Sequence, residues 1–343
     1  MITERVFGEI KGTSVPEVTI KNAAGMEVSI LAYGATIRSV IVPTDSGERI
    51  DVCLGYDTIE EYMNNSGHFG GSIGRFANRI GNAAFDLDGE HYTLAANTPP
   101  NHLHGGIHGW DTKIWRFSTD PDQNSVTFFY KSEDGEEGYP GNVQANAKFT
   151  VAADNRLIIE YTCVTDKATP VSMTNHWYFN LNGHASGDIL GHTLRVFADQ
   201  YTEADPNLVP TGRISSVAGT PYDFRQPKLI GKDFAVVREL DTAGYDNNLI
   251  LGKPGEFKKF ASLRGNRTGL TMISFTNMEA VQLYTGNHIT TRKGKNNTEY
   301  REMGGMCLEP QHYPDCVNKP EFPTAILRPG ETYYHHTEFV FEG

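Results

Sequence analysis

The amino-acid sequence predicts an all-β protein, a large antiparallel β-sandwich with few short helices. Its 343 residues include 35 Gly, 17 Pro, 18 Phe, 16 Tyr and 3 Trp, a mixture typical of short strands joined by turns. Short runs of alternating apolar and polar residues recur to the end of the chain, whereas the 3.6-residue periodicity of amphipathic helices is scarce. These observations favour strands over helices throughout.

The strands are expected at regular intervals along the chain. Alternate positions are apolar over residues 28–33, and a second apolar run covers 37–43. Between 85 and 94, the Asp88-Gly89 dipeptide separates two short alternating runs, which is the pattern of a tight β-hairpin. Further strands are predicted at 126–130, 143–151, 157–164, 194–197, 272–275 and 280–284.

Two segments carry a helical pattern, but neither is long enough to organise a domain. Asp57 and Glu60 stand three residues apart, like a capping box that opens a short turn, and residues 232–240 could form two or three turns. The sequence contains no Pro/Ser-rich linker, low-complexity tract or repeat of fixed period. Its length suits either one large or two ordinary domains. We therefore expect a single β domain over residues 1–343.

Charge and composition exclude several classes of protein. Thirty Lys and Arg against 42 Asp and Glu give a net charge of −12, the wrong sign for neutralising nucleic-acid phosphates. No 18 apolar residues occur together and the first residues lack an apolar run, so we expect neither a membrane span nor a signal peptide. The four cysteines lack CxxC spacing and are too few for a disulfide scaffold. We expect reduced thiols and a cytoplasmic location.

The densest polar cluster is the segment 101–111, NHLHGGIHGWD. On a strand, His102 and His104 would point to the same face, as in some mononuclear metal sites, and His108 would be a third candidate ligand. A downstream carboxylate at regular spacing is missing. The alternative interpretation is a Gly-rich loop whose histidines make hydrogen bonds.

A second cluster is the segment 173–181, MTNHWYFNL. With the two-residue period of a strand, His176, Tyr178 and Asn180 share one face, and the apolar side chains between them share the other. The polar face either lines a cavity or simply meets water, as on a half-buried strand.

The third cluster is the segment 306–315, MCLEPQHYPD. Glu309, between Leu308 and Pro310 and near aromatic residues, would be partly desolvated, which raises the pKa of a carboxyl group toward the working pH of a general base. The alternative is an exposed glutamate at the end of a strand, since Glu is rarely buried.

Other familiar catalytic patterns are missing from the sequence. We find no GxGxxG, Walker A or HExxH motif, and no helix pattern follows the glycine-rich segment 71–74. The remaining polar signals are GRFANRIG at 74–81, GYDNN at 244–248 and Gln282. Amides, carboxylates and guanidinium groups pair with vicinal hydroxyls, and aromatic rings cover the C–H faces of sugars. This inventory suits a neutral, hydroxyl-rich ligand.

Together, these segments resemble the aldose 1-epimerase family, the galactose mutarotases. The likeness spans nearly the whole chain and depends on the order and spacing of GRFANRIG, NHLHGGIHGWD, NHWYFNL and CLEPQHYPD. The resemblance implies a β-sandwich of galactose mutarotase type with an open sugar-binding cleft, and neither a metal nor an organic cofactor. It therefore argues against a metal role for the histidine cluster.

The resemblance also implies roles for individual residues. Glu309 matches the family's general base and His176 its general acid. The residues that match sugar-binding positions are Asn78, Arg79, His104 and Asp246, with Tyr178 and Gln282 as additional cleft residues. The segment at Asp246 departs from the commoner family pattern, in which His rather than Asn follows the aspartate, and this leaves the hydroxyl contacts there open.

The function implied is the interconversion of the α and β anomers of free aldohexoses, with activity on both galactose and glucose, by a monomer or weak homodimer. The charge of −12 does not favour phosphorylated sugars. One alternative is a metal-dependent oxygenase or isomerase that uses His102, His104 and His108. Others are a non-catalytic carbohydrate-binding or sugar-sensing protein, and a glycosidase that uses Asp246 and Glu309.

Overall fold

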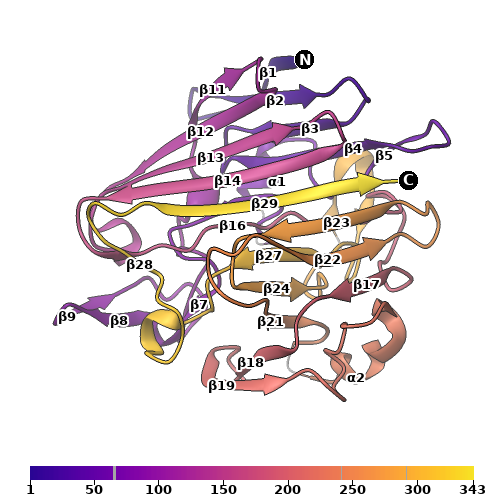
Figure 1. Cartoon of the computed structure of the whole chain (residues 1–343). Helices are drawn as coiled ribbons and strands as arrows, with labels where there is room; N and C mark the ends of the chain where they lie inside the picture. The colour runs from indigo at the N-terminus through magenta and orange to yellow at the C-terminus, as the bar shows by residue number, and fades with distance from the viewer. Residues whose placement is uncertain (65–66, 241, 291) are drawn as a thin grey trace.

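The structure is a computed structural model that describes residues 1–64, 67–240, 242–290 and 292–343. In these ranges, the named strands pair antiparallel, and three sheets contain most of them (Figure 1). The helices are short. The prediction of an all-β protein built from antiparallel sheets is confirmed.

The largest sheet forms a broad layer at the front of Figure 1. Its strands in the described part of the chain are, in spatial order, β11 (Arg116–Asp120), β12 (Ser125–Ser132), β13 (Val143–Val151), β14 (Arg156–Thr165), β29 (Tyr333–Glu342), β23 (Thr271–Thr276), β22 (Lys258–Arg264), β17 (Thr193–Val196) and β20 (Lys228–Leu229). Every second residue of β13 is buried and the residues between are more exposed. This pattern is expected where one face of a sheet covers a core and the other meets solvent.

Two five-stranded sheets complete the framework. The first has the order β1 (Ile2–Ile10), β2 (Thr13–Lys21), β3 (Glu27–Leu31), β4 (Thr36–Pro43) and β5 (Arg49–Asp51). The second has the order β19 (Pro210–Ser216), β18 (Gln200–Ala204), β21 (Asp246–Ile250), β24 (Ala280–Tyr284) and β27 (Cys307–Gln311). The second sheet carries the functional side chains described below.

Short elements connect these sheets. The two-stranded pairs are β10 (His102–Leu103) with β7 (Arg79–Ile80), β15 (Thr169–Pro170) with β28 (Ile326–Leu327), β16 (Thr174–Asn175) with β6 (Ser72–Ile73), β25 (Arg292–Lys293) with β26 (Glu299–Tyr300), and β8 (Ala84–Leu87) with β9 (Glu90–Thr93). The helical segments are α1 (Ile59–Met63), α2 (Phe234–Arg238) and the 3₁₀ turns η1 (Gly81–Ala83), η2 (Trp110–Thr112), η3 (Glu136–Gly138), η4 (Ile230–Asp233), η5 (Lys295–Asn297) and η6 (Cys316–Asn318).

The main hydrophobic core joins the large sheet to both smaller sheets. Phe128 of β12 and Phe339 of β29 belong to the same buried cluster as Ile30 of β3, Leu283 of β24 and Leu308 of β27. Removal of this apolar surface from water is the main force that holds the layers together. The core therefore also fixes the second five-stranded sheet, on which the site depends.

The strands predicted from alternation are confirmed as β3, β4, the β8–β9 hairpin, β12, β13, β14, β17, β23 and β24. The capping box of α1 is shifted by one residue, since Thr58 and Glu61 form it instead of Asp57 and Glu60. The carboxylate of Asp57 lies 3.4 Å from Arg38 instead. The helical segment predicted at 232–240 is present as η4 and α2.

In the ranges that the structure describes, no helix is long and apolar enough to cross a membrane.

Candidate active site

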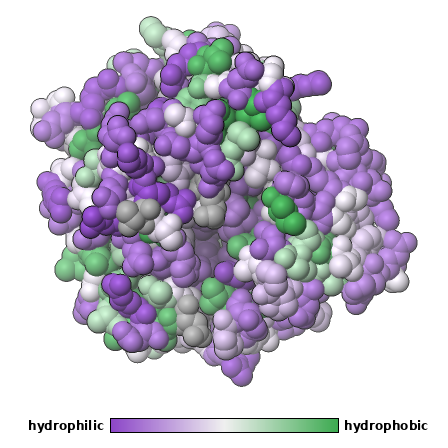
Figure 2. Space-filling view, turned by 180° about the vertical axis from the view of Figure 1, so that it is seen from behind, coloured by the Kyte–Doolittle hydropathy of each residue, from purple (hydrophilic) through white to green (hydrophobic). Residues whose placement is uncertain are grey.

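A pocket opens where the second five-stranded sheet meets the loops beside β10 and β16. Figure 2 shows the molecule from behind, with a hollow near the middle of this face that is bordered mainly by hydrophilic residues. Residues from β7, β21, β24 and β27 line the pocket together with residues from the loops.

Three neighbouring strands supply polar side chains to this pocket. On β24, Gln282 lies directly opposite Glu309 of β27, and Tyr284 lies opposite Asp246 of β21. Residues two apart on a strand share a face. The side-chain amide of Gln282 donates a hydrogen bond to Asp246 Oδ1 at 2.6 Å. The register of these strands therefore gathers two carboxylates, one amide and one phenol on one surface.

The segment 174–181 has the two faces that its sequence predicts. His176 and Tyr178 line the pocket, whereas Trp177 is fully buried in the main core. Asn180 does not line the pocket, because its side-chain amide donates hydrogen bonds to two backbone carbonyl groups. The polar face of this segment therefore borders a cavity, as one of the two interpretations expected.

Two hydrogen bonds, one to the imidazole and one between backbone groups, connect the two loop motifs of the site. The N–H of Asn78 donates to Nδ1 of His104 at 3.1 Å, and the N–H of His104 donates to the carbonyl oxygen of Asn78 at 3.1 Å. Next to them, Arg79 of β7 lies opposite Leu103 of β10. The pairing of β7 with β10 thus brings the side chains of Asn78, Arg79 and His104 to one side of the pocket.

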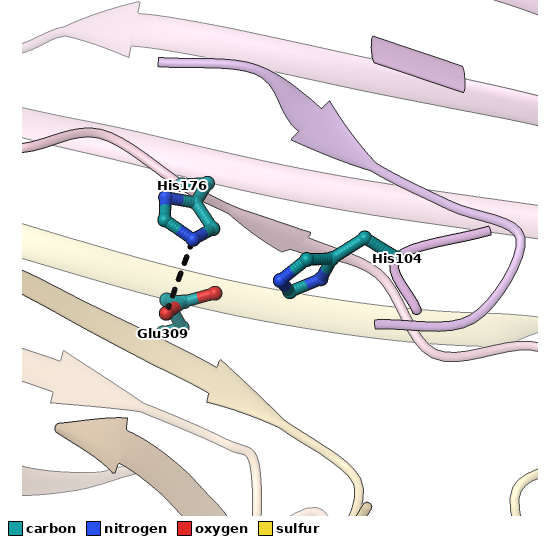
Figure 3. Close-up of side chains that lie close together, drawn as sticks. All are labelled: His104, His176 and Glu309. Carbon is teal, nitrogen blue, oxygen red and sulfur yellow. Dashed lines mark ion pairs between the residues drawn. The ribbon is translucent and has the colours of Figure 1, made fainter. Parts of the chain in front are cut away.

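His176 and Glu309 face each other in the pocket (Figure 3). Nε2 of His176 lies 3.8 Å from Oε1 of Glu309, and both side chains are at least nine-tenths buried. This distance is too long for a hydrogen bond. In the described part of the chain, Oε2 of Glu309 has no hydrogen-bond partner. Among these residues, the carboxyl group therefore has one buried oxygen without a hydrogen-bond partner.

The surroundings shift the pKa values of this pair in opposite directions. Burial raises the pKa of Glu309 well above its usual range, the charge of Asp246 raises it further, and Arg79 opposes the rise. Burial lowers the pKa of His176 to about 3, and His68 adds to this effect. In the empty pocket, both shifts favour the uncharged pair, a protonated Glu309 and a neutral His176.

The family of this chain is shown by its similarity to known proteins. The sequence model described as aldose 1-epimerase matches residues 16–340. The chain belongs to the aldose 1-epimerase family.

Relatives in this family match over nearly their full lengths. The chain is 39% identical to a mouse (Mus musculus) protein named galactose mutarotase, over 99% of this chain and 98% of the relative. It is 38% identical to a protein from Escherichia coli K12 named aldose 1-epimerase, over 94% of each chain.

Two crystal structures are also similar. An aldose epimerase homologue from Caenorhabditis elegans has a TM-score of 0.89 at 31% identity, covering 95% of this chain and 98% of the other. A galactose 1-epimerase from Lactobacillus acidophilus has a TM-score of 0.87 at 29% identity, covering 100% and 98%.

In this member of the family, the pocket brings together every site residue expected from the sequence. These residues are Asn78, Arg79, His104, His176, Tyr178, Asp246, Gln282 and Glu309.

Three buried potential metal ligands also meet in the pocket. Ligand atoms of His104, His176 and Glu309 lie within 4.8 Å of one another. However, Nδ1 of His104 accepts a hydrogen bond from the N–H of Asn78, which places the imidazole proton on Nε2. A metal at Nε2 would displace that proton, and a proton moved to Nδ1 would oppose the donor of Asn78. This donor set does not fit a metal ion, and it suits a hydrogen bond from His104 to a hydroxyl oxygen.

The structure contradicts the alternative metal site built from His102, His104 and His108. Nδ1 of His102 bonds to the carbonyl oxygen of Ala95 at 2.7 Å, and its Nε2 lies 2.8 Å from the hydroxyl of Tyr139. Both ring nitrogens are therefore occupied. His108 is exposed and does not line the pocket. The histidine-rich segment is a loop held by hydrogen bonds, as its other interpretation expected.

The unusual residue after Asp246 lies outside the sugar pocket. Asn247 borders a neighbouring pocket that also contains Tyr222, and it is not among the residues that line the site. Of these two neighbours, Asp246 lines the site and Asn247 does not.

Sequence reasoning missed several residues that line the pocket. They are Gly67, His68, Phe69, Leu103, Tyr284, His288, Ile289 and Arg292. Strand periodicity could have identified Tyr284, because it lies two residues after Gln282 on β24 and so shares its face. His68 lies in a loop without periodicity, and no motif marked it.

Proposed function

We propose that this chain interconverts the α and β anomers of a free aldohexose by opening and closing its hemiacetal ring. The observation that carries this proposal is the meeting of Glu309 and His176 in a buried pocket bordered by hydroxyl-binding groups. An acid and a base that hold one proton between them match the needs of a reaction with no net proton change.

The proposed reaction moves one proton in a cycle. Glu309, as carboxylate, takes the proton of the C1 hydroxyl while His176, as imidazolium, donates a proton to the ring oxygen. The C1–O5 bond breaks and the C1 oxygen becomes a carbonyl. After rotation about C1–C2, O5 attacks the other face of C1, His176 recovers its proton, and Glu309 returns its proton to the C1 oxygen. Each group ends in its starting state.

The bound sugar is expected to prepare the pair for this step. In the empty pocket, burial favours the protonated form of Glu309. Hydroxyl groups that donate to Oε2, the free acceptor, would favour the carboxylate, as does the positive charge of Arg79. The proton can then move to His176. General acid–base assistance of this kind contributes about 10²- to 10⁴-fold per group.

The remaining polar residues are proposed to hold the sugar. His104 has a hydrogen-bond donor on Nε2, and Asp246 and Gln282 offer acceptors. Holding the ring keeps C1 and O5 within reach of the acid and the base during bond rotation. Because one hydrogen bond to a hydroxyl contributes only about 1 kcal/mol, we expect activity on both galactose and glucose.

Polarimetry of freshly dissolved α-galactose and α-glucose tests the proposal. We expect Glu309→Gln and His176→Asn each to lower kcat by about 10²- to 10⁴-fold. Glu279→Gln is the matched control, since Glu279 is also fully buried and lies 2.6 Å from a histidine, His312, outside this pocket. The control should keep parental activity. Parental rates in Glu309→Gln or His176→Asn would refute these roles.

Three further measurements separate the alternatives. A carbohydrate-binding protein would bind the sugar without accelerating anomer exchange. A glycosidase would release the aryl group from aryl galactosides through Asp246 and Glu309, which both line the pocket. A metal-dependent enzyme would lose activity after dialysis against a chelator, whereas we expect no loss.

The setting proposed for this reaction is the cytoplasm, with a monomer or weak homodimer acting on a small sugar. The four cysteines are buried and unpaired, which suits a reducing compartment. Burial raises the pKa of Cys53 to about 12, so this thiol stays protonated and unreactive.

A further inference from the structure

A third histidine borders the pocket beside His104 and His176. The ring of His68 lies 4.9 Å from that of His104 and 5.8 Å from that of His176, centroid to centroid. Its side chain is 22% exposed and forms part of the pocket lining. His68 is therefore within reach of a ligand in the pocket.

Asp111 orients this ring. Its Oδ2 lies 2.7 Å from Nδ1 of His68, so Nδ1 carries a proton and donates it to the carboxylate. Burial lowers the pKa of His68, but the Asp111 carboxylate outweighs burial and raises it above the usual value. Among the described residues, no hydrogen-bond partner for Nε2 of His68 is found. When His68 is charged, this Nε2–H is a free donor at the pocket.

The backbone of His68 has a positive φ, as have two of the proposed sugar-binding residues. His68 has φ of 54°, Asn78 of 64° and His104 of 51°. This left-handed region is uncommon for residues other than glycine, and such residues accumulate at binding sites where the surrounding structure holds them.

We propose that His68 is a further substrate-binding residue, which donates a hydrogen bond from Nε2 to a sugar oxygen and is held in place by Asp111. This inference rests on the proposed function. Glu309 and Asp246 offer acceptors to the sugar, so a charged donor supplies the complementary contact.

The charge of His68 also acts on its neighbours. It contributes to the lowered pKa values of both His104 and His176. The other charged side chains that border the pocket are Arg79, Arg292, Asp246 and Glu309. Loss of the His68 side chain would remove this contribution to the pKa values of His104 and His176.

Binding and kinetics of three variants test this role. His68→Leu removes the donor, His68→Gln keeps an uncharged amide donor, and Asp111→Asn removes the carboxylate that supports the charge. For His68→Leu, we expect KM for galactose and the Kd for 1-deoxygalactose, which has no anomeric hydroxyl, to rise about 10-fold or more, with a smaller change in kcat. The KM and Kd values of His68→Gln and Asp111→Asn should lie between those of His68→Leu and those of the parent.

A histidine–aspartate pair on the surface provides the matched control. His91 and Asp86 lie at the same 2.7 Å, but the side chain of His91 is 65% exposed and outside the pocket. His91→Leu should leave KM and Kd unchanged. If His68→Leu does not fold, His68→Gln decides the question at a temperature where its circular dichroism spectrum matches the parent's.

A Kd within twofold of the parent's in the folded His68 variants would overturn the inference, while an active parent and an inactive Glu309→Gln variant would leave the proposed function intact. A parent that does not accelerate anomer exchange would instead remove the proposed function.

Discussion

Glu309 destabilises the empty protein. Its carboxyl group is buried at 2% exposure, and Oε2 finds no partner in the described ranges. Burial raises its pKa well above the value in the unfolded chain. A group of this kind leaves stability intact below its unfolded pKa and lowers it as the pH rises through the folded pKa, because ionisation favours the unfolded chain.

Replacement of Glu309 should therefore stabilise the protein. We expect Glu309→Gln to increase the free energy of unfolding by about 0.5–2 kcal/mol at neutral pH, the usual size of a stability–activity trade-off. The gain should grow from pH 4.5 upward and vanish below it. Thermal unfolding of parent and variant across this range measures the difference. A gain that does not change with pH would show that the ionisation of Glu309 is not its cause.

At the scale of elements, the segment 174–181 is a two-sided support for the site. Its pocket face carries His176, and on its other face Trp177 packs against Phe339 of β29, with the ring centroids 5.2 Å apart. Packing on the apolar face therefore fixes the direction of the proposed acid on the polar face.

Truncation of this support should be costly. We expect Trp177→Ala to lower the free energy of unfolding by about 3–5 kcal/mol, because Trp177 is completely buried and a cavity would remain. Urea unfolding measures this loss, and Trp177→Phe, which keeps an aromatic ring, should lose less. Equal losses in the two variants would contradict the packing explanation.

The sequence predicts where the strands lie along the chain better than it predicts which side chains come together in the folded protein. Alternation reports local burial, so it located strands such as β13 and β24 with nearly correct ends. That Arg79 and Glu309 border the same pocket depends on the tertiary fold, and only the resemblance of the motifs to a known family indicated it. His68 could not be found, since a loop residue has neither periodicity nor a motif of its own.

At the scale of the whole molecule, residues from both ends share one core. Ile30 near the start and Phe339 near the end belong to the same buried cluster. This supports the single domain expected over residues 1–343, which stays a prediction.

Buried neutral histidines should make the protein less stable as the pH falls. Burial lowers the pKa of His192 to about 4 and that of His335 to about 3. Groups with lowered folded pKa values stabilise the protein above their unfolded pKa of about 6.5, and this stability is lost as the pH falls. We expect the free energy of unfolding to fall between pH 6.5 and 4 by up to about 1.4 kcal/mol per pH unit for each histidine.

Chemical denaturation at several pH values measures how steeply the free energy of unfolding changes with pH. His335→Gln should flatten it, whereas His91→Gln, at an exposed position, should not. An unchanged slope in His335→Gln would mean that other groups control acid unfolding.

The place of β29 in the large sheet has a consequence for biosynthesis. This strand, the last along the chain, lies between β14 and β23 and so joins the two halves of the nine-stranded sheet (Figure 1). While the ribosome still holds residues 333–342, these halves cannot be bridged. Completion of this sheet therefore waits until residues 333–342 have left the ribosome, and until then the facing edges of β14 and β23 are exposed to aggregation or to chaperones.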